Sequence, residues 1–435
     1  MNAMSLSLLI SLLCLITGGT PESLASVRIF DVRQFGAKGD GKNLDTSAIQ
    51  EALDECGKTG GGIVRFPAGT FLSKPIFLRN QTTLELGAGA VLQATDERAA
   101  FESPEKTNAF MAFVNGKNLH DIAIIGRGTI DGAGARWWKP AEEARRKRPG
   151  YVLPRPSLIV LVDCTNVCVQ NVTLRNSPLT HLAPTSCEAV VISNITVSAP
   201  ARAANTDAID PIGCRNVLIT HCRMDVGDDN ISIKSNQANP DRPFASENIT
   251  VTDCIFLHGH GLSIGAATVG GVRNVTVRDC TFEDTENGFR IKSQRGRGGT
   301  VEHVRVSDIM MKNVDPAITL TCYYMNNSAR DPVQRSLPQN DPPQPVRNTT
   351  PTFRDIRISN LKATCQRSAG VICGLPESPI SDVILENVQI VAATTGLSIK
   401  NARRIQFENV KITNEEGPPF IVENAQIAGL KAVQK

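Results

Sequence analysis

A nine-residue phrase recurs along most of this 435-residue chain and limits the folds open to it. Each copy alternates apolar with polar residues and carries an Asn, Asp or His at its sixth position. Most copies start 22 to 32 residues after the previous one, a spacing typical of solenoid repeats. The copies are NVCVQNVTL from Asn166, AVVISNITV from Ala189, NVLITHCRM from Asn216, NITVTDCIF from Asn248, NVTVRDCTF from Asn274, HVRVSDIMM from His303, DIRISNLKA from Asp355, DVILENVQI from Asp382 and RIQFENVKI from Arg404.

The alternation within each copy predicts β-strands, because the side chains of a strand point to its two faces in turn. Only two or three polar residues separate neighbouring strands, which is too few for a helical crossover. One such coil cannot bury its apolar face alone, so coils stack and their strands pair in parallel. The chain is therefore predicted to be all-β, a single-stranded right-handed parallel β-helix, with the hand taken from the general crossover preference.

The first part of the chain differs from the repeat. Thr46 to Leu53 follow Gly and Asp residues and predict an amphipathic helix that caps the N-terminal end of the stack. A single catalytic domain is expected over residues 26–435, with loop insertions near 132–156 and 326–350. The second insertion lies in the one long interval between copies, which measures 52 residues.

The N-terminus resembles an export signal. The apolar run from Leu6 to Ile16 is too short to span a bilayer, and Ser23-Leu24-Ala25 is a plausible cleavage site. We expect residues 1–25 to be a secretory signal peptide and the mature chain to be secreted or periplasmic. The alternative is a buried N-terminal helix.

Composition excludes some classes of function. Hydrophobic residues are 41% of the chain and the net charge is +3, which indicates a packed protein and excludes a bulk electrostatic nucleic-acid binder. Of twelve cysteines, all but Cys14 lie in the expected mature chain. That odd number leaves at least one thiol free, and we expect most of these residues to be small buried hydrophobes. Without a C-x-x-C pair, a zinc site is not indicated.

Four polar clusters fall on consecutive coils. Counted from the start of their copies, Asp228 and His260 both lie at +12, while Asp207 and Lys292 both lie at +18. Equal offsets predict side chains stacked ~5 Å apart on one face. Each cluster alone is more simply a turn, a ladder or a solvated strand. The clusters are Asn205-Thr206-Asp207, Gly227-Asp228-Asp229, Gly259-His260-Gly261 and Arg290-Ile291-Lys292.

Together the clusters would bring three carboxylates, an imidazole and two cations to one patch. Close like charges are costly unless a function or a cation maintains them. Glycosidic cleavage needs such a set, because one carboxylic acid protonates the leaving oxygen while another carboxylate activates water or replaces it as nucleophile. The two cations would bind an anionic sugar.

The motifs NTD, GDD, GHG and RIK, in this order, resemble those of family 28 glycoside hydrolases, the polygalacturonases and their relatives. FDVRQFGAKGDG near residue 30, FPAGTF at 66, GTIDG at 128 and GGVRNVTVRDC at 270 are similar too, and the likeness covers about residues 28–415. The resemblance implies a right-handed parallel β-helix and inverting hydrolysis of α-1,4-galacturonosyl linkages in polygalacturonate or pectin, with no metal or cofactor. Ala208 and Asn230 depart from the residues that many members have there.

The resemblance also implies catalytic roles. Asp228 would be the general acid, and Asp207 and Asp229 would position and deprotonate the attacking water. His260 would tune the protonation of the acid, while Asn205 would orient its neighbouring carboxylate.

The substrate contacts follow in the same way. Arg290 and Lys292 would bind galacturonate carboxylates, and Tyr324, with Tyr323 as the alternative, would contact the sugar. Lys234 lies at +18, like Lys292, and is either a further anion contact or a solvated strand residue.

Other functions remain open from the sequence. A rhamnogalacturonan or modified-pectin hydrolase is the nearest alternative, while a calcium-dependent pectate lyase and a non-catalytic carbohydrate-binding solenoid belong to other classes. The expected partner is a pectic polysaccharide or oligogalacturonide, with no nucleic acid, no membrane and no second subunit. If the insertions border the cleft, the enzyme would act on chain ends.

Overall fold

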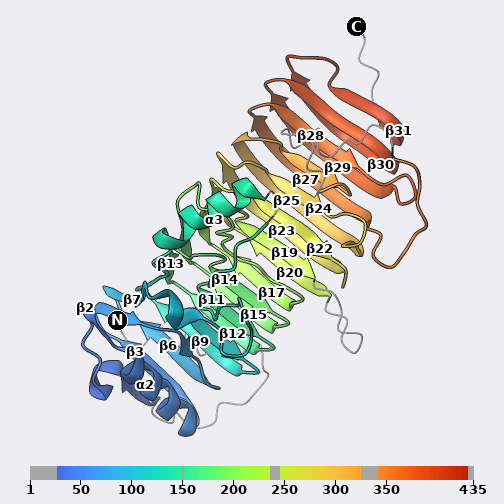
Figure 1. Ribbon diagram of the computed structural model, residues 1–435. Helices are drawn as coiled ribbons and strands as arrows, with labels where there is room; N and C mark the ends of the chain where they lie inside the picture. Colours follow the sequence, from blue (N-terminus) through green and yellow to red (C-terminus); the bar gives the residue numbers. More distant parts are fainter. Residues whose placement is uncertain (1–26, 149–150, 236–244, 325–340, 430–435) are drawn as a thin grey trace.

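The computed structural model describes residues 27–148, 151–235, 245–324 and 341–429. Its coils stack into an elongated solenoid that runs from the first strands at one end to β31 (Phe420–Ala428) at the other (Figure 1). All the strand pairs between coils are parallel, so the predicted right-handed parallel β-helix is confirmed. The predicted signal peptide, residues 1–25, lies outside the described residues.

Three parallel sheets form the walls of the solenoid. The first contains β1 (Ile29–Asp31), β3 (Gly62–Phe66), β6 (Thr82–Leu86), β9 (His120–Gly126), β12 (Thr165–Gln170), β15 (Glu188–Ser193), β17 (Arg215–Thr220) and β20 (Ser246–Thr252). The second contains β2 (Asp40–Leu44), β4 (Gly69–Ser73), β7 (Ala90–Ala94), β10 (Thr129–Asp131), β13 (Thr173–Arg175), β16 (Thr196–Ser198), β18 (Arg223–Asp225) and β21 (Ile255–Leu257).

Longer strands run through both of these walls in the later coils. They are β23 (Val272–Glu283), β25 (Thr300–Val314), β27 (Thr352–Cys365), β29 (Ile380–Ala392) and β30 (Thr395–Asn414). The third sheet begins with β5 (Ile76–Phe77), β8 (Val114–Lys117), β11 (Ile159–Val162) and β14 (Leu182–Thr185). Isolated bridges through Ile209 and Ile212 connect β14 to the rest of this wall. That part contains β19 (Ile231–Ser235), β22 (Leu262–Thr268), β24 (Phe289–Lys292), β26 (Ile318–Thr321) and β28 (Ser368–Cys373).

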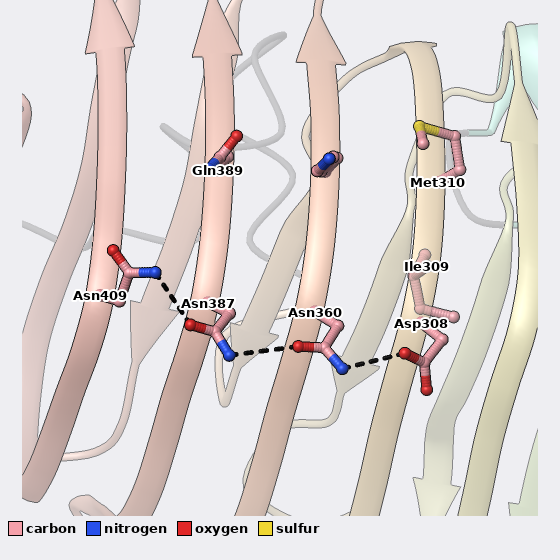
Figure 2. Close-up of a pocket in the computed structure, with 8 residues that line it drawn as sticks. Asp308, Ile309, Met310, Asn360, Asn387, Gln389 and Asn409 are labelled. Atoms are coloured by element: carbon pink, nitrogen blue, oxygen red, sulfur yellow. Dashed lines mark hydrogen bonds between the residues drawn. The ribbon is translucent and has the colours of Figure 1, made fainter.

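Left-handed backbone explains the form of the repeated phrase. The first and the sixth residue of every copy have φ between 51° and 63°, and the sixth turns the chain from the first wall to the second. Asn and Asp tolerate this conformation best among residues with a side chain. Their side chains also join neighbouring coils: Asn409 donates to Asn387, Asn387 to Asn360 and Asn360 to Asp308, over 2.9, 3.2 and 2.9 Å (Figure 2). We call these four residues the asparagine ladder.

The interior consists of columns of matching apolar side chains. Phe256 and Phe282 stack face to face at 4.3 Å between ring centroids, and Val, Ile, Leu, Ala and Cys make up most of the other buried side chains. All eleven cysteines in the described ranges are free thiols, and all but Cys168 are buried, as expected of small hydrophobes.

Helix α2 (Thr46–Lys58) covers the N-terminal end of the stack, which confirms the predicted cap. Its Ala48, Ile49, Ala52 and Leu53 are buried. Short 3₁₀ turns, η1 (Val32–Phe35) and η2 (Arg98–Phe101), complete the first coils. Within the described ranges, no helix is long and apolar enough to cross a membrane.

The first predicted insertion is not only a loop. Helix α3 (Ala135–Lys147) occupies it and lies along the flank of the solenoid (Figure 1). The helix forms because Trp137 and Ala141, one turn apart, are both buried; Trp137 packs edge-on against Phe110 at 5.4 Å. Of the second predicted insertion, only residues 341–350 are described, and they contain no helix or strand.

Candidate active site

The four polar clusters meet on the outer side of the third sheet. Ile231 of β19 pairs with Leu262 of β22, Leu262 with Phe289 of β24, and Phe289 with Ile318 of β26. Ile209 extends this row through an isolated bridge to Ile231. The segments that carry the clusters are therefore neighbours in space.

Equal offsets predicted the neighbours of one pair of residues correctly and those of the other pair wrongly. Asp228 and His260 are adjacent, as their equal offsets predict, with 2.9 Å between Asp228 Oδ1 and His260 Nδ1. Asp207, however, lies level with Asp229, because Ile209 pairs with Ile231. Lys292 pairs instead with Gly265, further along the strands. The expectation fails because the turn after β16 is longer than the turns of the next coils.

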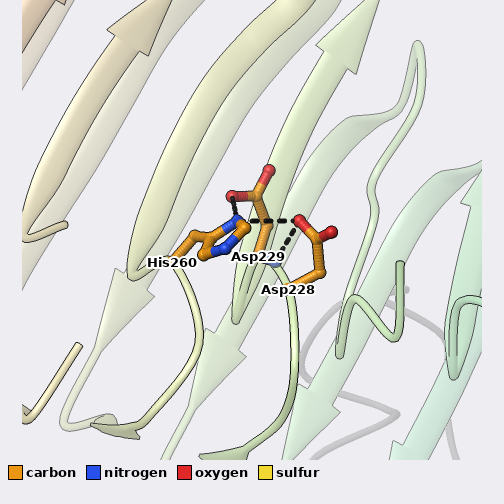
Figure 3. Close-up of side chains that lie close together, drawn as sticks. All are labelled: Asp228, Asp229 and His260. Carbon is orange, nitrogen blue, oxygen red and sulfur yellow. Dashed lines mark hydrogen bonds and ion pairs between the residues drawn. The ribbon is translucent and has the colours of Figure 1, made fainter. Parts of the chain in front are cut away.

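His260 contacts carboxylates through both ring nitrogens. Its Nδ1 lies 2.9 Å from Asp228 Oδ1 and 3.8 Å from Asp229 Oδ1 (Figure 3). Its Nε2 lies 3.1 Å from Glu286 Oε2. Gly259 and Gly261 fix the loop, since their φ values are 74° and 67° and a Cβ atom would lie within 2.4 Å of neighbouring carbonyl oxygens.

These contacts set the charges of the pair. Burial alone would lower the pKa of His260, but the Asp228 and Glu286 carboxylates raise it to about 10. The pKa of Asp228 is lowered, because the His260 cation outweighs the effect of burial. In the free protein the shared proton therefore resides on His260.

Asp229 is held by four donors. Its Oδ1 accepts from Arg290 Nη2 at 2.6 Å and Ser263 Oγ at 3.0 Å, and its Oδ2 from Lys292 Nζ at 2.8 Å and Ser232 Oγ at 3.0 Å. All of these groups are buried. Lys292 and Arg290 keep the pKa of Asp229 low despite its burial.

A second charged group lies beside Asp207. Lys234 Nζ is 3.2 Å from Asp207 Oδ2 and 2.7 Å from Asp210 Oδ2. Burial and the nearby Asp210 carboxylate raise the pKa of Asp207 well above its usual range. Lys234 thus contacts two carboxylates of its own chain, whereas its expected contact with a substrate anion stays a prediction.

Asn205 connects the general-acid candidate to the first insertion. Its backbone N and side-chain Nδ2 lie 3.1 and 3.4 Å from Asp228 Oδ2. Its Oδ1 accepts from Nη2 of the buried Arg155 at 3.0 Å, and Arg155 also donates to the carbonyls of Pro178 and Ala204.

The two tyrosines differ in their surroundings. The Tyr324 ring lies 4.7 Å from Lys292 Nζ and 5.9 Å from Arg290 Cζ, measured to the ring centroid. Tyr323 instead donates to Asp341 Oδ2 at 2.5 Å, within an ion-pair network around Arg295. Tyr324 is therefore the one of the two that joins the site.

Several members of the site were not predicted from the sequence. Ser232 and Ser263 give no signal of their own, and neither does Arg155, which reaches the site from a distant insertion. Glu286 precedes Arg290 by four residues and Asp210 follows Asp207 by three, so a search for further acids near the motifs would have found both.

The two departures from the family pattern are structural. Asn230 donates to the carbonyls of Met224 and Leu257 and accepts from Gly261 N, so it joins neighbouring coils directly behind the site. Ala208 is fully buried.

Among the described residues, Asp228, Asp229 and His260 are grouped closely enough to ligate a metal ion, with one ligand atom of each within 4.8 Å of the others. A cation there would lie beside the buried Arg290 and Lys292, which already neutralise Asp229. The charge balance therefore favours an acid–base site over a metal site.

The chain is similar to known proteins over most of its length. The model of "Glycosyl hydrolases family 28" matches residues 56–413. An endo-polygalacturonase of Pectobacterium carotovorum subsp. carotovorum is 35% identical over 298 residues, which are 64% of this chain and 72% of the relative. A hyperthermoactive exopolygalacturonase from Thermotoga maritima superposes with a TM-score of 0.76 at 27% identity, over 92% of this chain and 94% of that one. A polygalacturonase from Erwinia carotovora ssp. carotovora gives 0.70 at 27%, over 94% and 99%.

Proposed function

This chain belongs to glycosyl hydrolase family 28 and is a glycoside hydrolase, and on that premise we propose that it cleaves α-1,4-galacturonosyl linkages of polygalacturonate and pectin with inversion. The observation that carries the proposal is the patch itself. One carboxylate paired with an imidazolium lies beside two further carboxylates and two buried cations.

Asp228 is the general acid of this proposal. Protonation of the glycosidic oxygen requires a proton at Asp228, and His260, bonded to it at 2.9 Å, is the group that can supply one. Asn205 holds the other carboxylate oxygen in place. As the C1–O bond breaks, the leaving oxygen takes this proton.

Asp207 and Asp229 activate the water in this proposal. The water oxygen bonds to C1 from the face opposite the leaving group while its proton passes to a carboxylate, which inverts the configuration. The proton transfer to the leaving oxygen and the proton transfer from the water occur together, so the total charge of the site does not change.

Arg290 and Lys292 bind the sugar carboxylate, and Tyr324 contacts the sugar ring. Arg290 uses Nε and Nη2 for Ser263 and Asp229, and the proposal assigns Nη1 to the uronate. Two cations beside the acid favour plain galacturonan over modified pectin, because the uronate charge is the feature that they recognise.

We also propose exo action, with release of monogalacturonate from chain ends. In support, Arg155 of the first insertion contacts the segment that carries Asn205, and Asp341 of the second contacts Tyr323, so both insertions reach the margins of the site. The exopolygalacturonase from Thermotoga maritima has the same fold over nearly its whole length. A rapid fall in viscosity at low conversion of long polygalacturonate, with a ladder of mid-sized oligomers, would instead indicate endo action.

Product analysis on polygalacturonate tests the reaction itself. Hydrolysis gives new reducing ends without unsaturated products and is unaffected by a calcium chelator. Unsaturated products that disappear with the chelator would mean a pectate lyase. Cleavage of a modified pectin alone would mean the related hydrolase, and binding without cleavage would mean a carbohydrate-binding solenoid.

The chain is further proposed to be exported, as a secreted or periplasmic monomer, because the apolar run from Leu6 to Ile16 is followed by a cleavage signal. N-terminal sequencing of protein from the periplasm or medium tests this. An uncleaved Met1 in the cell interior would contradict it.

A further inference from the structure

The two carboxylates assigned to water activation have opposite surroundings. Asp229 accepts from four donors, two of them cations, which is close to the full capacity of a carboxylate. Asp207 has one cation, Lys234, and shares it with Asp210. Asp229 is therefore a stable anion, whereas Asp207 retains an affinity for a proton.

Asp210 has no role in the mechanism given above. It is only 3% exposed, and its Oδ1 has no hydrogen-bond partner among the described residues. Its Oδ2 bonds Lys234 at 2.7 Å and accepts from Thr180 Oγ1 at 3.4 Å. A buried carboxylate with an unpartnered oxygen is expensive to keep charged.

When both are ionised, the two carboxylates of Asp207 and Asp210 and the single cation of Lys234 have a net charge of −1. Such a pair titrates as a unit, with one proton held more tightly than an isolated carboxyl would hold it. We propose, building on the hydrolase function above, that Asp210 and Lys234 are positioning residues that tune Asp207 as the base which accepts the proton of the attacking water. Asp229, whose acceptor sites are occupied by its four donors, stays ionised and acts on the water as a fixed negative charge.

The proton step balances within this group. Water loses a proton to Asp207 as its oxygen bonds to C1, and the proton that Asp228 gives to the leaving oxygen restores the overall charge. Asp207 faces Lys234 and Asp210, and it also interacts electrostatically with the more distant charges of Asp228, Asp229 and Arg155. Asp210 and Lys234 are the nearest of these charges, and they act in opposite directions on the pKa of Asp207: Asp210 raises it and Lys234 lowers it.

This opposition gives a signed test. The acid limb of kcat/KM on polygalacturonate reports the deprotonation of the base in the free enzyme. Asp210→Asn removes the negative neighbour, so this limb moves to lower pH, by about one unit. Lys234→Met removes the cation, so it moves to higher pH by a similar amount. In the double variant the acid limb returns towards its wild-type pH. Lys234→Arg keeps the positive charge, so its acid limb is expected to stay at the wild-type pH.

Asp45→Asn is the matched control. Asp45 is equally buried and hydrogen-bonded, to Lys38 N and Gly39 N, but lies in the N-terminal coil. In this variant the acid limb of kcat/KM is expected to stay at the wild-type pH. Shifts of one sign in both single variants, or no shift in either, overturn the inference and leave the hydrolase function intact. Absence of hydrolysis by the wild-type enzyme refutes the proposed function instead.

Discussion

The asparagine ladder and the active site are both stacks of polar side chains on neighbouring coils of one solenoid, and they differ in charge. In the ladder, Asn360 and Asn387 each donate to the coil before them and accept from the coil after them (Figure 2). In the site, Asp228, Asp229 and His260 are crowded together (Figure 3), and the buried cations Arg290 and Lys292 lie beside them.

The difference shows what a regular stack can do. Neutral groups that both donate and accept satisfy one another at the coil spacing, so the ladder can repeat without a partner from outside. Charged groups of like sign cannot satisfy one another in this way, and their pKa values move apart. The pKa of Asp207 is raised, whereas the pKa values of Asp228 and Asp229 are lowered. Separate proton affinities within one patch are what acid–base chemistry requires.

An Asp-to-Asn substitution in the active site and one in the ladder should differ most in their effect on turnover. Asp228→Asn is expected to lower hydrolysis by roughly 10²- to 10⁴-fold, because an amide cannot pass the proton of His260 on to the leaving oxygen. Asp308→Asn in the ladder keeps the acceptor for Asn360 and should leave turnover unchanged. Initial rates of reducing-end formation measure both. Half of the wild-type rate in Asp228→Asn would remove the acid assignment.

Cation removal should give the next largest effect. Lys292→Met leaves the buried Asp229 with one cation and is expected to destabilise the fold by about 3 kcal/mol as well as to weaken cleavage. Lys312→Met removes an exposed partner of Glu283 and should not change the midpoint of unfolding. Urea titrations and steady-state kinetics provide the comparison.

The substrate offers a second test of the same cations. Full methyl esterification removes the uronate charge, so cleavage should slow sharply in the wild type and less in Lys292→Met. Equal wild-type rates on the two polymers would remove the reason to assign Arg290 and Lys292 to the sugar acid.

The smallest effect concerns the ladder alone. Asn387→Ala loses a donated and an accepted hydrogen bond and places Ala at φ 51°, at an expected cost of about 1 to 2 kcal/mol with activity unchanged. Asn387→Gly keeps the backbone conformation accessible and should recover part of this loss. If the two variants are equally unstable, the backbone conformation contributes little and the hydrogen bonds account for the loss.

The predictable parts of the molecule are those governed by the repeat. Alternation and the regular spacing of the copies predicted the coils. Equal offsets predicted that Asp228 lies beside His260, because the turns of their coils have nearly the same length. Asp207 was misplaced because the turn after β16 is longer, and turn length is not part of the repeat. The contact between Arg155 and Asn205 depends on the path of an insertion, which no periodicity encodes.

Because the site is assembled across the stack, its geometry depends on the distance between adjacent coils rather than on their number. That distance is the ~4.8 Å spacing of paired strands, the same throughout the solenoid. Since each coil contacts mainly its neighbours, coils can be gained or lost outside the segment from Asn205 to Tyr324 without moving Asp228 relative to His260. The length of the binding surface can therefore diverge among relatives while the reacting groups keep their mutual positions.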